Sequence, residues 1–512
     1  MLSKKIKSNS EKLVFNTVLM YLKSIMTVFL LLYTSRVIYI ALGIRDFGIY
    51  SLLGGAIAIC GFINTAVGVS TQRFLSFEMG KNNIDGINQT LNASILIHGG
   101  IGLIVVILTE TVGLLLFSNL TIPLDRMNAA FWSYQALVVG FTVSIVTGPF
   151  LALINAKEDM HILVVIEITD IIVRIFLAFI ISVIPYDRLI SFSFLTVLFS
   201  IIDLIAIIFI CNQRYKISGL KKDNDTSLIY RMISFSGWNL FGAIAMVGKN
   251  QGLALILNMF HGVTVNASYA IANQVSGQLT SFSQSAIRAV NPQITKSFSL
   301  GDLEQMYTLV FRSSKFVFFV LFTISIPVLF ETKLIMSAWL GDVPIYTIAF
   351  CRLIIVNSII DVISFPLMSA IQATGKINRY TSVIGLVLLS IIPISYYLLK
   401  ANMNPTAILF SMIVITVIAL FIRIEFARQL IGLSRIRWMY SVVFKLLPIV
   451  LLTLLPVFLI NNYMISGVYR FVVICIVVGA VSTISFLIFG LDIYERKYFI
   501  NKANSYLKNS KC

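Results

Sequence analysis

Long apolar runs recur along the whole chain, separated by short polar segments that carry most of its charges. Each run has about twenty residues or more, the length that an α-helix needs to cross the hydrocarbon core of a bilayer. The pattern predicts an all-α polytopic membrane protein with about fourteen spans, each placed to within several residues. The spans are 13–42, 47–72, 90–117, 129–154, 161–184, 188–211, 231–259, 264–290, 307–331, 344–373, 379–400, 405–430, 438–461 and 467–490.

The stretch from Asn258 to Asp302 differs from the other runs because it is long enough to span a bilayer yet rich in amide, hydroxyl and glycine residues. At helical spacing its polar residues share one side. This stripe consists of Asn266, Asn273, Gly277, Ser281, Gln284 and Arg288. Such a stripe at membrane depth either lines a hydrated cavity or packs against another helix through small residues and amide hydrogen bonds. Arg288 favours the cavity, because a charge at membrane depth costs roughly 3 kcal/mol or more.

Three pairs of similar segments, each pair about 220 residues apart, indicate a weak internal repeat. PFLALINAK at Pro149 is similar to PLMSAIQAT at Pro366, FLSFEMGKNN at Phe74 to ITKSFSLGDL at Ile294, and IYSL at Ile49 to SYAI at Ser268. We expect two six-helix bundles related by a pseudo-two-fold axis along the membrane normal, because six spans return the chain to the same side. The expected parts are the two bundles, a cytoplasmic linker, two additional spans and a cytoplasmic tail. In chain order they are residues 1–213 (bundle), 214–230 (linker), 231–432 (bundle), 433–490 (two spans) and 491–512 (tail).

Composition and charge agree with this prediction. The 512 residues are 58% hydrophobic and 12% charged, with a mean hydropathy of +0.92, which excludes an ordinary soluble domain. The formal net charge of +17 comes from Lys and Arg between the apolar runs, so it indicates topology rather than nucleic-acid binding. With a cytoplasmic N-terminus, about 26 Lys and Arg lie at the termini and cytoplasmic loops and about 6 in the opposite loops. We therefore expect a multi-pass protein with both termini in the cytoplasm.

No pattern typical of an enzyme or a metal site is present in the sequence. The five cysteines and three histidines are scattered, without the spacing of a metal or redox site. There is also no P-loop, no dinucleotide-binding glycine motif in a strand context and no long outer loop for a glycan-transfer site. We expect a transporter without its own ATPase, and neither an enzyme nor a bound cofactor.

Each half of the repeat places a lysine on a polar face of its first helix. With Arg288, Lys23 and Lys249 would give a central cavity a positive potential, which attracts phosphate or pyrophosphate rather than organic cations. Lys23 also fits a side chain that reaches the cytoplasmic surface, and Arg36 fits either outer headgroups or the outer rim of the cavity. The expected cavity residues are Lys23, Lys249, Arg288, Asn239, Asn273, Gln284 and Arg36.

Several carboxylates fall within the expected spans. Glu167, Asp170 and Arg174 follow one another at spacings of three and four, which predicts an intrahelical cluster of charges that neutralise one another. The other acids fit two roles: binding a coupling H+ or Na+, or a structural ion pair with Arg174 or Arg352, of which the second is favoured. The candidate coupling residues are Asp170, Asp203 and Asp361.

Fourteen spans in two six-helix halves with a two-helix appendage resemble the multidrug, oligosaccharidyl-lipid and polysaccharide (MOP) exporter superfamily, whose fold is MATE-like. Three stretches of the sequence are similar to bacterial flippases for O-antigen and capsular polysaccharide repeat units. They are SRVIYIALGIRDFGIYSLLGGA around Arg36, FSGWNLFGAIAMVGKNQGLALILNMF from Phe235, and VNASYAIANQV followed by AVNPQITKSF. The similarity covers most of the chain and is strongest between Phe235 and Asp302.

The resemblance implies that the protein carries an undecaprenyl-pyrophosphate-linked oligosaccharide from the inner to the outer leaflet of a bacterial plasma membrane by alternating access. Relatives of this type have a cationic central cavity, which Lys23, Lys249 and Arg288 match by helix position, and often use an ion gradient. Multidrug members often carry an acid on the first or seventh helix, where this chain has Lys23 and Lys249, so coupling to H+ or Na+ stays open. The implied partners are the lipid-linked glycan, membrane lipids, glycosyltransferases and a polysaccharide polymerase, with a monomer as the working unit.

Three other functions compete with this one. A cation-coupled multidrug exporter of the same fold needs acids and aromatic residues in its cavity, whereas the expected cavity is basic. A flippase for the peptidoglycan lipid precursor would carry a chemically close substrate. A membrane-embedded glycan polymerase or ligase would need large outer loops with catalytic residues, and the sequence has none.

Overall fold

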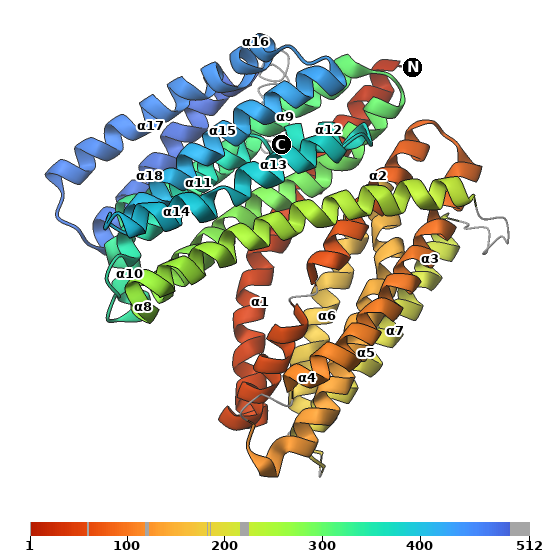
Figure 1. Cartoon of the computed structure of the whole chain (residues 1–512). Helices are drawn as coiled ribbons and strands as arrows, with labels where there is room; N and C mark the ends of the chain where they lie inside the picture. The colour runs from red at the N-terminus through yellow and green to blue at the C-terminus, as the bar shows by residue number, and fades with distance from the viewer. Residues whose placement is uncertain are drawn as a thin grey trace, which may run out of the picture. The chain divides into compact units, whose positions relative to one another are not determined.

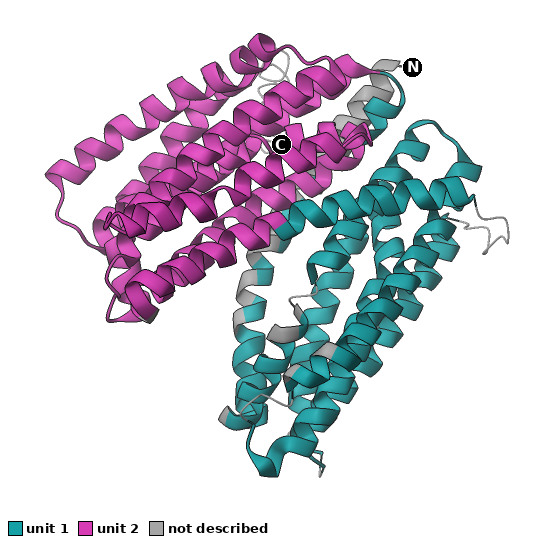
Figure 2. Cartoon of the chain, in the orientation of Figure 1, with its two compact units in different colours: residues 1–244, 295–301 teal, residues 245–294, 302–512 magenta. Residues whose placement is uncertain are grey.

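The computed structural model describes residues 2–58, 61–117, 122–181, 183–184, 186–215 and 225–491 (Figure 1). Within these ranges the regular elements are all helices and there is no β-strand, so the expectation of an all-α protein is confirmed. The chain divides into two compact units (Figure 2). Unit 1 comprises residues 1–244 and 295–301, and unit 2 comprises residues 245–294 and 302–512.

Two long helices are each interrupted at a glycine. α1 (Leu2–Ala58) breaks at Gly43 (φ 79°, ψ 168°), and α8 (Thr226–Ser299) breaks at Gly262 (φ 75°, ψ −173°). Residues with a Cβ rarely adopt these angles, so glycine allows one helix to end and the next to begin without a loop. The two breaks are 219 residues apart (262 − 43), which agrees with the repeat period of about 220 residues expected from the sequence.

Unit 1 is built around α5, which packs against five other helices of the unit. Its buried residues include Ile145, Leu153 and Ile154, all at most 1% exposed. α1 also packs along α6 (Met160–Ile181). After α1 the unit contains α2 (Gly61–Gly80), α3 (Ile84–Leu108), η1 (Thr109–Gly113), α4 (Leu114–Phe117), η2 (Leu124–Arg126), α5 (Met127–Ala156), α6 (Met160–Ile181), α7 (Arg188–Tyr215) and the beginning and end of α8.

Unit 2 is built around α15 and α9, which both pack against α11 and α12. Residues of α8 between 245 and 294 join the same apolar core, where Leu253 and Ala272 are fully buried beside Phe350. The remaining elements are α9 (Leu303–Phe330), α10 (Thr332–Leu340), α11 (Thr347–Val362), α12 (Phe365–Ala373), α13 (Asn378–Leu389), α14 (Ile391–Lys400), α15 (Thr406–Ile431), α16 (Arg435–Trp438), η3 (Met439–Val443), α17 (Phe444–Tyr463), α18 (Val468–Ser485) and η4 (Phe486–Gly490).

Many helices coincide with the expected spans. The span expected at 405–430 is α15, and the span expected at 344–373 is the pair α11 and α12, bent by 40° between Val362 and Phe365. Among the described residues, nine helices are long and apolar enough to cross a membrane, or ten if that bent pair forms one span. The expected total of fourteen, the two six-helix bundles and the domain boundaries stay predictions.

The last two helices of the described chain, α17 and α18, belong to unit 2 and are fixed to α9. Arg470 at the start of α18 forms a buried ion pair with Glu331 at the end of α9. Near the other end of α18, Lys315 Nζ donates to the Gly490 carbonyl oxygen at 2.5 Å. Polar contacts at both ends therefore hold this hairpin along α9.

Candidate functional site

A polar face is exposed on the second arm of α8, between the break at Gly262 and the end of the helix. It consists of Gln274, Gly277, Gln278, Ser281, Gln284 and Arg288, all exposed except the half-buried Ser281. The opposite side of this arm enters the core of unit 2, where Tyr269 and Ala272 are buried. The buried side of this arm is apolar and its exposed side is polar, whereas a helix in contact with lipid exposes apolar side chains. The exposed side therefore needs water or a polar ligand instead of lipid.

Arg288 lies at membrane depth by the length of the helix. The arm runs from residue 263 to Ser299, so its midpoint is residue 281, and Arg288 lies seven residues beyond that point. Seven residues correspond to about 10 Å of helix. If the arm is centred on the bilayer, this is less than the half-thickness of the hydrocarbon core, about 15 Å. The guanidinium is therefore not suited to contact with lipid.

The exposed stripe keeps four of the six residues that helical spacing predicted, namely Gly277, Ser281, Gln284 and Arg288. Gln284 and Arg288 are exposed as expected, but Asn266 and Asn273 are half-buried. The Asn273 amide donates to the Tyr269 carbonyl oxygen of its own helix at 3.0 Å. Gln274 and Gln278 take these places, and their spacing from Gly277 and Ser281 would have identified them.

In unit 1, Lys23 is enclosed and forms an ion pair with Glu167 of α6. The predicted cluster of Glu167, Asp170 and Arg174 is therefore wrong for Glu167. Asp170 pairs with Arg174 of the same helix at 3.0 Å, whereas Glu167 pairs with Lys23 of α1. Asp170 and Arg174 line a cleft of about 400 Å³ within unit 1. The other residues that line it are Leu31, Thr34, Ser35, Ile38, Phe47, Tyr50, Ser51, Gly54 and Ile171.

Three further expected residues of unit 1 lie elsewhere. Arg36 is exposed on α1, outside that cleft. Asn239 is half-buried and its amide donates to the Phe235 carbonyl oxygen at 3.0 Å. Asp203 on α7 is half-buried and makes no ion pair or hydrogen bond with another described residue, so the expected pairing with Arg174 is not formed.

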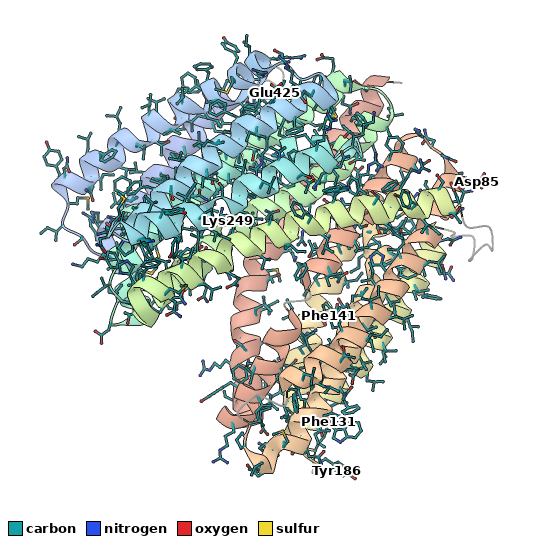
Figure 3. All side chains as sticks on the ribbon, viewed as in Figure 1. Asp85, Phe131, Phe141, Tyr186, Lys249 and Glu425 are labelled. Atoms are coloured by element: carbon teal, nitrogen blue, oxygen red, sulfur yellow. The ribbon has the colours of Figure 1, made fainter. Side chains whose placement is uncertain are left out.

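In unit 2, Lys249 is only 6% exposed and lies in the first arm of α8 (Figure 3). Asp361 pairs with Arg423 of α15 at 2.6 Å, not with Arg352. Arg352 instead donates to the Leu329 carbonyl oxygen at 3.0 Å. Arg423 was not predicted as the partner of Asp361, although it falls within the expected span 405–430, where a charged side chain is expected to be paired.

Comparison with known proteins gives a fold and no closer relative. No model of a known protein family matches the chain, and no curated protein matches it. Among solved structures, an outward-facing multidrug resistance MATE family transporter of the MOP superfamily is similar over 82% of this chain and 95% of its own, with 13% identity and a TM-score of 0.69.

A MATE structure in the bent conformation is similar over 83% of this chain and 95% of its own, with 11% identity and a TM-score of 0.72. The chain has the MATE fold. A MOP superfamily transporter from Pyrococcus furiosus, whose reversed pocket polarity is described as suggesting a different function, shares it at 13% identity and a TM-score of 0.68. That structure covers 82% of this chain, and this chain covers 95% of it. The MATE fold supports the expectation of a multi-pass membrane protein and leaves the cargo to be argued from the side chains.

Proposed function

We propose that this protein is a flippase that moves an undecaprenyl-pyrophosphate-linked oligosaccharide from the inner to the outer leaflet of a bacterial plasma membrane by alternating access. The observation that carries the proposal is the polar face of α8. A sugar-pyrophosphate headgroup cannot enter hydrocarbon without replacements for its hydration. The amides of Gln274, Gln278 and Gln284 are suited to sugar hydroxyl groups, and the Arg288 guanidinium is suited to pyrophosphate oxygens.

The charge of this arm favours an anionic cargo over an organic cation. Residues 263–294 contain Arg288 and neither Asp nor Glu. A drug cation would need a carboxylate or an aromatic surface in that position. The same fold carries the multidrug transporters, so dye efflux is the competing function, and a peptidoglycan lipid precursor is the competing cargo.

Proteoliposomes test the proposal directly. A fluorescent undecaprenyl-pyrophosphate oligosaccharide in one leaflet is followed by its exposure to an impermeant quencher. Charge-assisted hydrogen bonds contribute about 1.5–3 kcal/mol, so Arg288→Gln is expected to slow flipping roughly 10- to 100-fold. Arg379→Gln, an exposed arginine on α13 outside the polar face, is the matched control and is expected to flip at the wild-type rate.

Two results would count against this function. Equal flipping by Arg288→Gln and wild-type protein would remove the polar face from the mechanism. Export of cationic dyes by the same vesicles, without lipid flipping, would support the multidrug function, and rescue of cells depleted of their peptidoglycan precursor flippase would support that cargo.

The same flipping assay, run under imposed H+ or Na+ gradients, identifies the coupling ion by which gradient changes the rate of flipping. Of the three candidate acids, Asp170 and Asp361 are engaged by Arg174 and Arg423, whereas Asp203 has no such partner among the described residues. We therefore place coupling, if a gradient accelerates flipping, at Asp203. Asp203→Asn is expected to flip at the same rate with and without the gradient. The proposal further takes the monomer as the working unit, with glycosyltransferases and a polymerase as partners.

A further inference from the structure

The cleft of about 400 Å³ in unit 1 is distinct from the polar face of α8, because the residues that line it belong to α1 and α6. Its volume falls within the range of small-ligand pockets, about 300–1,000 Å³. Apolar side chains provide much of the lining, among them Leu31, Ile38, Phe47 and Ile171. A mostly apolar lining with a few polar groups that orient the ligand is typical of binding pockets for small molecules.

The charged groups of the cleft lie at the middle of their helix. α6 runs from Met160 to Ile181, so its centre falls between Asp170 and Ile171. Asp170 pairs with Arg174 at 3.0 Å, and the two side chains are 36% and 34% exposed. If α6 is centred on the bilayer, this pair lies close to the midplane, where ionisable side chains face a bundle interior or a hydrated cavity. The cleft therefore has to hold water or a polar ligand.

The ion pair leaves hydrogen-bonding groups unused. Arg174 Nε donates to Asp170 Oδ2, whereas the two Nη groups of Arg174 and Asp170 Oδ1 make no hydrogen bond with another described residue. Tyr50 also lines the cleft, and its hydroxyl makes no hydrogen bond with another described residue. The Tyr50 ring packs against Phe192, with the ring centroids 5.3 Å apart. The cleft therefore offers both donors and acceptors on side chains that the unit already positions.

The charges of these groups discriminate between classes of ligand. The Asp170 carboxylate and the Arg174 guanidinium neutralise each other. An organic cation would have to compete with Arg174 for the carboxylate, and pyrophosphate would have to compete with Asp170 for the guanidinium. A sugar residue carries no charge, and each of its hydroxyl groups both donates and accepts hydrogen bonds. The balanced pair therefore favours a sugar over either ion.

We propose, resting on the flippase function above, that the cleft binds one uncharged sugar residue of the transported glycan. The Arg174 Nη groups donate to hydroxyl oxygens of the sugar, and Asp170 Oδ1 accepts from one of its hydroxyl groups. The Tyr50 hydroxyl supplies a further hydrogen bond, and the apolar side chains contact the C–H groups of the ring. Unit 1 thereby has a sugar site of its own, in addition to the amides of α8.

Free sugars test the cleft separately from flipping. The full-length protein is purified in a detergent without a sugar headgroup, and its Tm is measured with increasing concentrations of glucose, galactose or N-acetylglucosamine. A ligand that binds only the folded state raises the Tm saturably, and about 3 °C is expected at ten times Kd. Sorbitol at equal concentrations is the control for general stabilisation by excluded polyols, which does not saturate.

Two substitutions alter the cleft and keep its ion pair. Gly54 lines the cleft, and a Cβ there would meet no atom within 4 Å, so Gly54→Leu fills the space and is expected to abolish the saturable rise. Tyr50→Phe removes one hydroxyl group and is expected to weaken binding about 2- to 10-fold. Tyr186→Phe, at an exposed tyrosine outside the cleft, is the matched control and is expected to bind like the wild type (Figure 3).

The sugar site is overturned if none of the three sugars raises the Tm saturably, or if Gly54→Leu responds like the wild type. It is also overturned if a cationic dye, and no sugar, gives a saturable rise that Gly54→Leu abolishes, because the cleft would then be a drug site. Saturable sugar binding by a protein that does not flip the lipid-linked glycan would support the sugar site and remove the flippase function, so the two failures are distinguishable.

Discussion

The ion pair between Glu331 and Arg470 is the contact that should decide whether the last two helices stay on α9. The two side chains are 2% and 10% exposed, and Arg470 Nη1 also donates to the Met464 carbonyl oxygen at 3.1 Å. Removal of one partner from such a pair leaves a buried charge without compensation, whereas removal of both partners leaves an apolar contact. Single and double substitutions should therefore differ sharply.

The size of the effect follows from the cost of leaving the Glu331 carboxylate buried without its cation. Removal of one partner from a buried ion pair costs about 3–5 kcal/mol. At about 2 °C per kcal/mol, Arg470→Met is expected to lower the Tm by about 6–10 °C.

Thermal unfolding in detergent at pH 7 measures this shift. The double variant Glu331→Leu with Arg470→Met is expected to recover most of the loss, because no buried charge remains. Arg437→Met is the matched control: its ion pair with Glu304 joins side chains that are 46% and 69% exposed, so the Tm should barely change. A loss for Arg470→Met no larger than that for Arg437→Met, or a double variant no more stable than Arg470→Met, would refute the reasoning.

Two smaller perturbations test other parts of the fold. Gly262→Ala is expected to lower the free energy of unfolding by about 1–3 kcal/mol because φ at this break is 75°. Gly237→Ala is the control, because a Cβ there would lie in open space on a helical turn, and it is not expected to lower the free energy of unfolding. Equal Tm values for the two variants would contradict the assigned break. Burial raises the pKa of Asp187, but the hydrogen bonds from Arg126 and from the amides of Leu189 and Ile190 outweigh it and hold that pKa below its usual value. The carboxylate therefore stabilises unit 1 above about pH 4 and ceases to do so as the pH falls through this lowered pKa, so Asp187→Asn should lower the Tm at pH 7 and not in strong acid. A constant Tm difference across that range would argue against the ion pair.

Much of the fold could be predicted from the sequence because lipid imposes a simple requirement on each segment. The run 405–430 is apolar over most of its length, and in hydrocarbon its backbone groups can find hydrogen-bond partners only within the segment. It therefore becomes a helix, and the structure has α15 there. The repeat was visible in weak similarities near Pro149 and Pro366, and the breaks at Gly43 and Gly262 follow the same period. That α8 would expose a polar side could also be predicted, because amides and Arg288 at membrane depth exclude contact with lipid.

Only the tertiary structure decided which partners the charged residues choose. Spacing along one helix suggested that Glu167 would stay with Asp170 and Arg174, but Lys23 of α1 takes it. Asp361 pairs with Arg423 of a distant segment. The periodicity of a helix fixes which side chains share a face, whereas the rotation of that face and its neighbours depend on how whole helices pack. Neighbouring side chains point about 100° apart around a helix, so Gln274 is exposed whereas the adjacent Asn273 is half-buried and donates to its own backbone.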